Sequence, residues 1–142
     1  QAVVSQSELL DKQGKTDESR QLLARQLAAH PESAYLQHAL GMWLLHHGER
    51  PYALLGLSKA VELAPDNPDY RYDLATTLHA QDEVEAAQRQ LEEIVQRHPA
   101  NRKARVLLVN YWKETGQLQN VQVLLAQLEQ QNPDDPALQQ GL

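Results

Sequence analysis

The sequence predicts an all-α protein in which helical hairpins are stacked in an array. The first observation is a series of four prolines with a constant 34-residue spacing, namely Pro31, Pro65, Pro99 and Pro133. A fixed period of this length is typical of stacked repeats. The second observation is composition: good helix formers dominate, glutamine occurs eighteen times, and β-branched residues rarely alternate with polar ones. Both observations favour helices and disfavour a sheet.

Further columns keep the same period. They divide the array, residues 1–135, into four repeats: 1–33, 34–67, 68–101 and 102–135. Three apolar columns and one turn column stand out: Leu23, Leu57, Leu91 and Leu125; Leu10, Leu44, Leu78 and Trp112; Gln6, Leu40, Leu74 and Leu108; Gly14, Gly48, Asp82 and Gly116. Short amphipathic hairpins cannot bury their apolar stripes alone, so each repeat must stack on its neighbours.

The second repeat shows how each hairpin is built. Ser33 can cap the first helix, in which Leu36, Leu40, Leu44 and Leu45 share one face. Gly48 ends that helix, because the residue beyond a helix C-terminus often needs a positive φ. Pro51 can open the second helix without the loss of a hydrogen bond, and Pro65 ends it. The pair Asn67–Pro68 then starts the next helix.

These columns resemble the tetratricopeptide repeat (TPR), whose pattern runs Trp, Leu, small residue, Tyr, then Ala, Phe, Ala and Pro. The second repeat matches it with Gln37, Leu40, Gly41, Leu44, Ala53, Leu57, Ala60 and Pro65, and the third with Arg71, Leu74, Ala75, Leu78, Ala87, Leu91, Ile94 and Pro99. The resemblance implies an α-α superhelix, or solenoid, of helix-turn-helix hairpins. Small residues such as Gly41 and Ala53 are expected where the two helices of a hairpin cross closely.

Both ends depart from the pattern. The first repeat has Gln6, Ser7, Ser19 and Gln26 in columns that should be apolar or small, and the fourth places Val109 and Val121 at small-residue positions. The two valines predict a wider crossing in the last hairpin. Degenerate terminal repeats are expected in solenoids, because their outer faces are wetted. Residues 136–142, with Asp135 as the cap and Pro136 as the first residue, are predicted to start a C-terminal capping helix.

The resemblance also implies a function, namely the binding of a peptide or partner segment in the concave groove lined by the first helices of the repeats. The family's groove positions correspond here to Tyr35, His38, Met42, His46, Asp69, Tyr72, Asp73, Thr76, His79, Lys103, Asn110 and Lys113. Such a mixture of aromatic, methionine, amide and charged groups suits an extended or helical peptide. The alternative for Tyr35, Met42 and Tyr72 is that they simply pack between repeats.

A specialised use of the family, the clamp that grips the acidic C-terminus of heat-shock proteins, is not expected here. Its cations would fall at Val4, Asp69 and Asp73 in one frame, or at His38, Lys103 and Leu107 in the next, and neither set supplies them. Aspartates stand where lysine and arginine are needed. A second hypothesis is a structural scaffold that self-associates through the ends of the solenoid, because an open end exposes apolar residues such as Leu138 and Leu142.

Other classes of function find no support in the sequence. There is no metalloprotease motif, glycine-rich phosphate loop or cysteine, so we expect no enzyme, cofactor or metal site. The histidines, among them the adjacent pair His46 and His47, lack the spacing of a chelating set. A net charge of −6 disfavours nucleic acid, and no apolar run is long enough to span a membrane. The chain starts without methionine, so any targeting segment would lie outside it and the compartment stays unknown.

Overall fold

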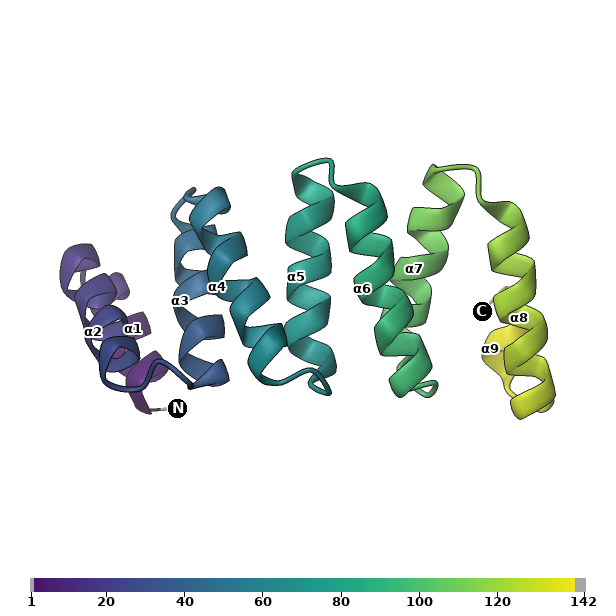
Figure 1. The fold of residues 1–142 in the computed structure, drawn as a ribbon, viewed down its shortest axis with the longest axis horizontal. Helices are drawn as coiled ribbons and strands as arrows, with labels where there is room; N and C mark the ends of the chain where they lie inside the picture. The colour runs from purple at the N-terminus through teal and green to yellow at the C-terminus, as the bar shows by residue number, and fades with distance from the viewer. Residues whose placement is uncertain (1, 140–142) are drawn as a thin grey trace. The chain divides into compact units, whose positions relative to one another are not determined.

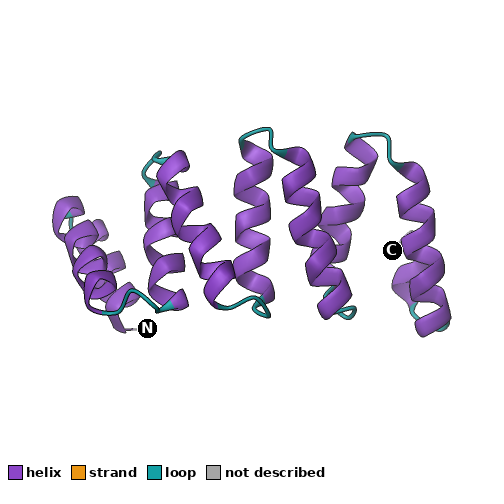
Figure 2. Cartoon of the chain, in the orientation of Figure 1, coloured by secondary structure: helices purple, strands orange, loops and turns teal. Residues whose placement is uncertain are grey.

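The computed structural model describes residues 2–139, and over this range it contains helices and turns but no strand (Figures 1 and 2). The helices are α1 (Ala2–Lys12), α2 (Thr16–Ala29), α3 (Ala34–His46), α4 (Arg50–Leu63), α5 (Pro68–Ala80), α6 (Val84–Arg97), α7 (Arg102–Glu114), α8 (Leu118–Gln131) and α9 (Pro136–Gln139). The first helices of the four repeats are α1, α3, α5 and α7, and are called A helices below. The predicted all-α class is confirmed.

The chain divides into two compact units, residues 1–77 and residues 78–142. The first unit holds α1 to α4 and most of α5, up to Thr77. The second unit holds the last residues of α5 together with α6 to α9. Each unit has a core of its own.

The same kind of cap recurs at the start of three A helices. The Ser33 hydroxyl accepts a hydrogen bond from the backbone N–H of Leu36 at 3.2 Å. The amide oxygens of Asn67 and Asn101 accept equivalent bonds, three residues on, at 3.1 and 3.0 Å. These oxygens pair with N–H groups that have no partner within the helix. The cap predicted at Ser33 is therefore confirmed, as is the predicted helix start at Asn67–Pro68, and the 34-residue period is a period of helix starts.

The column that holds tryptophan in the family pattern has a different task in this chain. Side chains of that column donate to the carbonyl oxygen of the preceding periodic proline: Gln37 to Pro31 at 3.5 Å, Arg71 to Pro65 at 2.9 Å and Arg105 to Pro99 at 3.0 Å. Both arginines are nearly covered, with 8% and 6% of their surface exposed. In the family pattern this column holds a bulky indole, whereas in this chain it holds long polar side chains. These side chains join α3, α5 and α7 to the turns that precede them.

The turn inside each hairpin has a residue with positive φ at the predicted column. Gly14, Gly48 and Gly116 have φ values of 76°, 81° and 72°, and Asp82 has 64°. Glycine adopts this conformation without a Cβ clash, and aspartate is among the few other residues that tolerate it. The backbone N–H of Glu49 reaches back to the carbonyl of Leu44 at 2.8 Å, which closes the end of α3.

The core of the first unit depends on a close approach of α3 and α4. A Cβ on Gly41 would lie 3.0 Å from Cγ of Leu57, and one on Gly56 would lie 3.0 Å from the carbonyl oxygen of Gln37. Ala53 and Leu57 are fully buried at this crossing. The predicted reason for a small residue at position 41 is confirmed: a larger side chain would separate the helices.

The second unit is packed around Leu91, Ile94 and Leu108, all of which are buried. Val109 and Val121 are also buried, and α7 and α8 approach each other less closely than α3 and α4 do. The wider crossing predicted from these two valines is therefore present. Beyond α8 the chain forms the short turn α9, with Leu138 partly covered. Residues 140–142 of the predicted capping segment lie outside the described residues.

Candidate functional site

A groove lies between α1 and α3 in the first unit. It encloses about 360 Å³ and is lined by Val4, Ser7, Glu8 and Asp11 of α1, Leu23 of α2, and Tyr35, His38, Ala39, Met42, Trp43, His46 and His47 at α3. We call it the α1–α3 groove. It brings together four of the residues predicted from the sequence, Tyr35, His38, Met42 and His46. Among the described residues that line it, the charged ones are the carboxylates Glu8 and Asp11, with three imidazoles and no lysine or arginine.

Trp43 is fixed in the groove wall by a polar network that starts in the first hairpin. Its indole Nε1 donates to Oδ2 of Asp11 at 3.1 Å and to the hydroxyl of Ser19 at 3.1 Å. The Ser19 hydroxyl donates to the carbonyl oxygen of Ser7 at 2.9 Å and lies 2.7 Å from the Ser7 hydroxyl. Both serines are buried. The two serines that depart from the family pattern thus have partners, and they connect α1, α2 and α3.

His47 stacks on the indole of Trp43, with ring centroids 3.7 Å apart and an angle of 14° between the planes. Its Nδ1 lies 2.7 Å from the carbonyl oxygen of Trp43, so this nitrogen carries the proton and donates it. Nε2 is 3.7 Å from Asp11, which makes an ion pair only when the imidazole is protonated. The stack leaves Trp43 and His47 as one rigid wall of the groove.

His38 joins the groove to α5. Its Nε2 lies 2.7 Å from Oδ2 of Asp73, and its ring stacks on Tyr70 with centroids 4.6 Å apart. Burial raises the pKa of Tyr70, and the charge of Asp69 raises it further. The pKa of Tyr35 is also raised, first by burial and then by Tyr70 and Glu8, while a backbone hydrogen bond at Val4 opposes the rise. These tyrosines are therefore held as neutral phenols beside the groove.

The remaining predicted residues of the first unit lie on α5. Thr76 donates to the carbonyl of Asp73 at 3.0 Å, within its own helix. Asp69 is exposed, and Tyr72 is half-buried. Tyr70, which the sequence analysis did not select, is the residue of α5 that stacks on His38. In the repeat frame Tyr70 stands two positions before the column of that histidine, which passes through Tyr72.

The second unit has a similar group of a histidine, a tyrosine and a carboxylate, placed nearer the C-terminal ends of α5 and α7. Nε2 of His79 lies 2.9 Å from Oε2 of Glu114, and the imidazole stacks on Tyr111 at 4.0 Å with an interplanar angle of 7°. The partners again stand on either side of the histidine's column, the tyrosine two positions before it and the carboxylate one position after it. The other predicted residues of this unit, Lys103, Asn110 and Lys113, are exposed on α7.

Over the described range, no three side chains of histidine, cysteine, aspartate or glutamate gather closely enough to hold a metal ion. Within that range no helix combines the length and apolar character that crossing a membrane requires.

Capped antiparallel helix pairs that recur with a 34-residue period, with a positive-φ turn inside each pair, define a helical-hairpin repeat protein. A family profile described as tetratricopeptide repeat matches residues 53–123, half of the chain. The chain belongs to the tetratricopeptide repeat family. No curated protein sequence matches it.

Solved structures show the same fold. The crystal structure of MamA superimposes with a TM-score of 0.72 at 18% identity, covering 95% of this chain and 79% of that one. The first TPR of Spaghetti (RPAP3), bound to the HSP90 peptide SRMEEVD, gives 0.69 at 18% identity, with 81% and 94% covered. An O-GlcNAc transferase variant from Thermobaculum terrenum gives 0.64 at 25% identity, but only 21% of its chain is covered. At such low identities the likeness shows the fold.

Proposed function

We propose that this chain is a protein-interaction module that binds a peptide or partner segment along its A helices, with the α1–α3 groove as the principal site. The observation that carries the proposal is the groove lining, in which Tyr35, Met42 and Trp43 surround a cavity of about 360 Å³. Aromatic and methionine side chains supply apolar contact area that adapts to a bound chain, and the imidazoles and carboxylates supply hydrogen bonds.

The charge of the groove selects the kind of peptide. Glu8 and Asp11 are the charged lining residues, apart from the imidazoles, and Asp69 is exposed on α5. Like charges across an interface are unfavourable, so the partner segment is neutral or basic. Spaghetti was solved with an acidic HSP90 peptide. The two-carboxylate clamp would need cations where this chain has Asp69 and Asp73, so the proposed ligand differs in charge from that peptide.

The groove is also preorganised. Trp43 is held by Asp11 and Ser19, and His38 is held by Asp73, before any ligand arrives. Side chains that are already ordered lose less conformational entropy on binding. Neither catalysis nor a cofactor nor nucleic acid enters this proposal.

The experiment is selection from a random dodecapeptide display library. Peptides are enriched on the wild-type chain and then measured by calorimetry against Met42→Lys, which removes the methionine contact and adds a cation that repels a basic ligand. Neutral or basic sequences that bind wild type and weaken at least about tenfold on Met42→Lys support the proposal, a loss of roughly 1.4 kcal/mol. Tyr52→Ala, at an exposed residue of α4, is the matched control and should bind as wild type. Equal affinity for Met42→Lys would remove the groove assignment.

The alternative, self-association through an end of the array, has one specific observation in its favour. Leu9 is 55% exposed beside a cavity that the outer faces of α1 and α2 form, with Leu10 and Leu22 in its walls. An apolar opening at the end of a repeat array is a natural place for a second copy to stack. Sedimentation distinguishes the two functions: a monomer at all concentrations excludes the scaffold, and a dimer that Leu9→Lys abolishes supports it. Leu142, which also suggested stacking, lies outside the described residues.

A further inference from the structure

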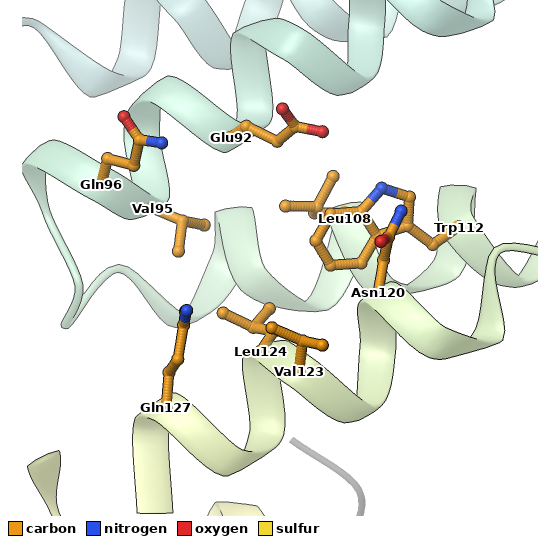
Figure 3. A pocket seen from close by; sticks show the side chains of 9 residues that line it. All are labelled: Glu92, Val95, Gln96, Leu108, Trp112, Asn120, Val123, Leu124 and Gln127. Carbon is orange, nitrogen blue, oxygen red and sulfur yellow. The ribbon is translucent and has the colours of Figure 1, made fainter. Parts of the chain in front are cut away.

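A second cavity lies in the second unit, on different helices from the α1–α3 groove. Its walls come from α6 and α8, and its floor from α7 (Figure 3). It encloses about 280 Å³ and is lined by Glu92, Val95, Gln96, Leu108, Trp112, Asn120, Val123, Leu124 and Gln127. We call it the α6–α8 pocket.

Glu92 is the charged residue of this lining. Its carboxylate makes no hydrogen bond or ion pair with any side chain in residues 2–139, whereas its neighbour Glu93 pairs with Arg97 at 3.1 Å. Burial raises the pKa of Glu92; the charge of Arg89 partly opposes that rise, and Glu93 adds to it. A partly buried carboxylate without a contacting counterion is unfavourable, and a cation that entered the pocket would relieve the cost.

The rest of the pocket is shaped for a long side chain with a charged end. Trp112 is 7% exposed, and its indole forms part of the floor between Leu108 and Asn120 in Figure 3. Leu124 and the half-exposed Val123 continue the apolar surface along α8. The amides of Gln96, Asn120 and Gln127 complete the lining with neutral hydrogen-bonding groups. An indole face attracts ammonium and guanidinium groups through the negative potential of its ring.

We propose that the α6–α8 pocket binds a lysine or arginine side chain of a protein partner. The aliphatic stem lies against Val123 and Leu124, and the cationic end lies against the indole of Trp112 and pairs with Glu92. None of the described residues that line the pocket is a cation that would oppose this. The proposal concerns α6 to α8 and does not depend on the α1–α3 groove, so either site can fail without the other.

The test follows the indole N–H signals by NMR while Nα-acetyl-lysine methylamide, which keeps its side-chain ammonium group, is added to the full chain. The signal of Trp112 should move and saturate, and that of Trp43, in the first unit, should stay in place as an internal reference. N-acetyl-norleucine methylamide has the same stem without the charge and should bind at least about threefold more weakly. Glu92→Gln should weaken lysine binding by about three- to tenfold, as expected for one partly exposed ion pair and its hydrogen bond.

Two variants guard against trivial results. Glu93→Gln changes the neighbouring carboxylate, which faces Arg97, and should bind the lysine compound as wild type does. Asn120→Lys changes an exposed residue of α8, so it should fold normally, and its ammonium should exclude the ligand from the pocket. A Trp112 signal that stays still, equal binding of the norleucine compound, or full affinity in Glu92→Gln would each overturn the proposal.

Discussion

The imidazole of His38 lies 2.7 Å from the carboxylate of Asp73, and this contact joins α3 to α5 inside the first unit. The same relation recurs between His79 and Glu114 at 2.9 Å, at the same separation along the chain. In both cases a tyrosine of the following A helix, Tyr70 or Tyr111, stacks on the histidine ring. One histidine–tyrosine–carboxylate cluster thus connects α3 to α5, and a second connects the end of α5 to α7. The first also orders His38, which lines the α1–α3 groove.

The two clusters differ in exposure, and this predicts a difference in stability. The side chains of His38 and Asp73 are 21% and 29% exposed, whereas those of His79 and Glu114 are 31% and 55% exposed. Loss of a less exposed hydrogen bond costs more, so His38→Ala should lower the free energy of unfolding by about 1 kcal/mol and His79→Ala by about half of that. Urea denaturation measures both. A larger loss in His79→Ala would contradict the ranking.

The network around Trp43 predicts a second effect. Trp43→Phe keeps an aromatic ring but removes the N–H that Asp11 and Ser19 accept, so two polar groups lose a partner. The expected cost is about 1–3 kcal/mol, seen as a lower Tm. Tyr52→Phe, which alters an exposed aromatic residue of α4, should change stability by less than about 0.5 kcal/mol. If Trp43→Phe and Tyr52→Phe have the same Tm, the hydrogen bonds of Trp43 contribute nothing to the stability of the first unit.

The turn column predicts a stabilising substitution. Asp82 has φ 64°, whereas the equivalent residue is glycine in the other three repeats. Because a side chain makes the left-handed conformation unfavourable, Asp82→Gly should raise the free energy of unfolding by about 0.5 kcal/mol. Asp82→Ala should lower it by a similar amount or more, since alanine lacks the local hydrogen bonding of aspartate. The urea midpoints of the three chains should fall in the order glycine, aspartate, alanine.

The regular part of the fold could be predicted from the sequence because it depends on local chemistry. Serine and asparagine, as at Ser33 and Asn67, cap a helix that starts directly after them. Glycine, as at Gly48, readily adopts the positive φ that the end of a helix often needs. A column of such residues with a 34-residue period is therefore enough to predict where the helices start and end. The wider crossing could be predicted from Val109 and Val121 for another reason: these columns hold small residues in the family pattern, and larger side chains there keep two packed helices apart.

The contacts around the candidate sites could not be predicted in this way. His38 meets Tyr70 and Asp73 because side chains on adjacent A helices are displaced along the helix axes, so neither partner falls in the column of the histidine. Ser7 and Ser19 depart from the family pattern because they bond to each other, and Ser19 also accepts a hydrogen bond from Trp43 of α3. Each contact depends on how two helices are placed relative to each other, and the 34-residue period of the sequence does not specify that placement.

The α6–α8 pocket predicts a pH-dependent effect of Glu92→Gln on stability. Burial raises the pKa of Glu92, so between its ordinary value and the raised one the folded chain binds more protons than the unfolded chain. Stability is therefore lost as the pH rises through this window, and a glutamine, which is neutral throughout, avoids the loss. Solvent screens the partly exposed carboxylate, so the gain at pH 7 should stay below about 1 kcal/mol and disappear below about pH 4. Urea midpoints at the two pH values measure it.

The control is Glu93→Gln, which breaks the pair with Arg97 and should not gain stability at pH 7. If Glu92→Gln were less stable than wild type at pH 7, the carboxylate would have a counterion in solution, and the pocket would have no need of a basic partner.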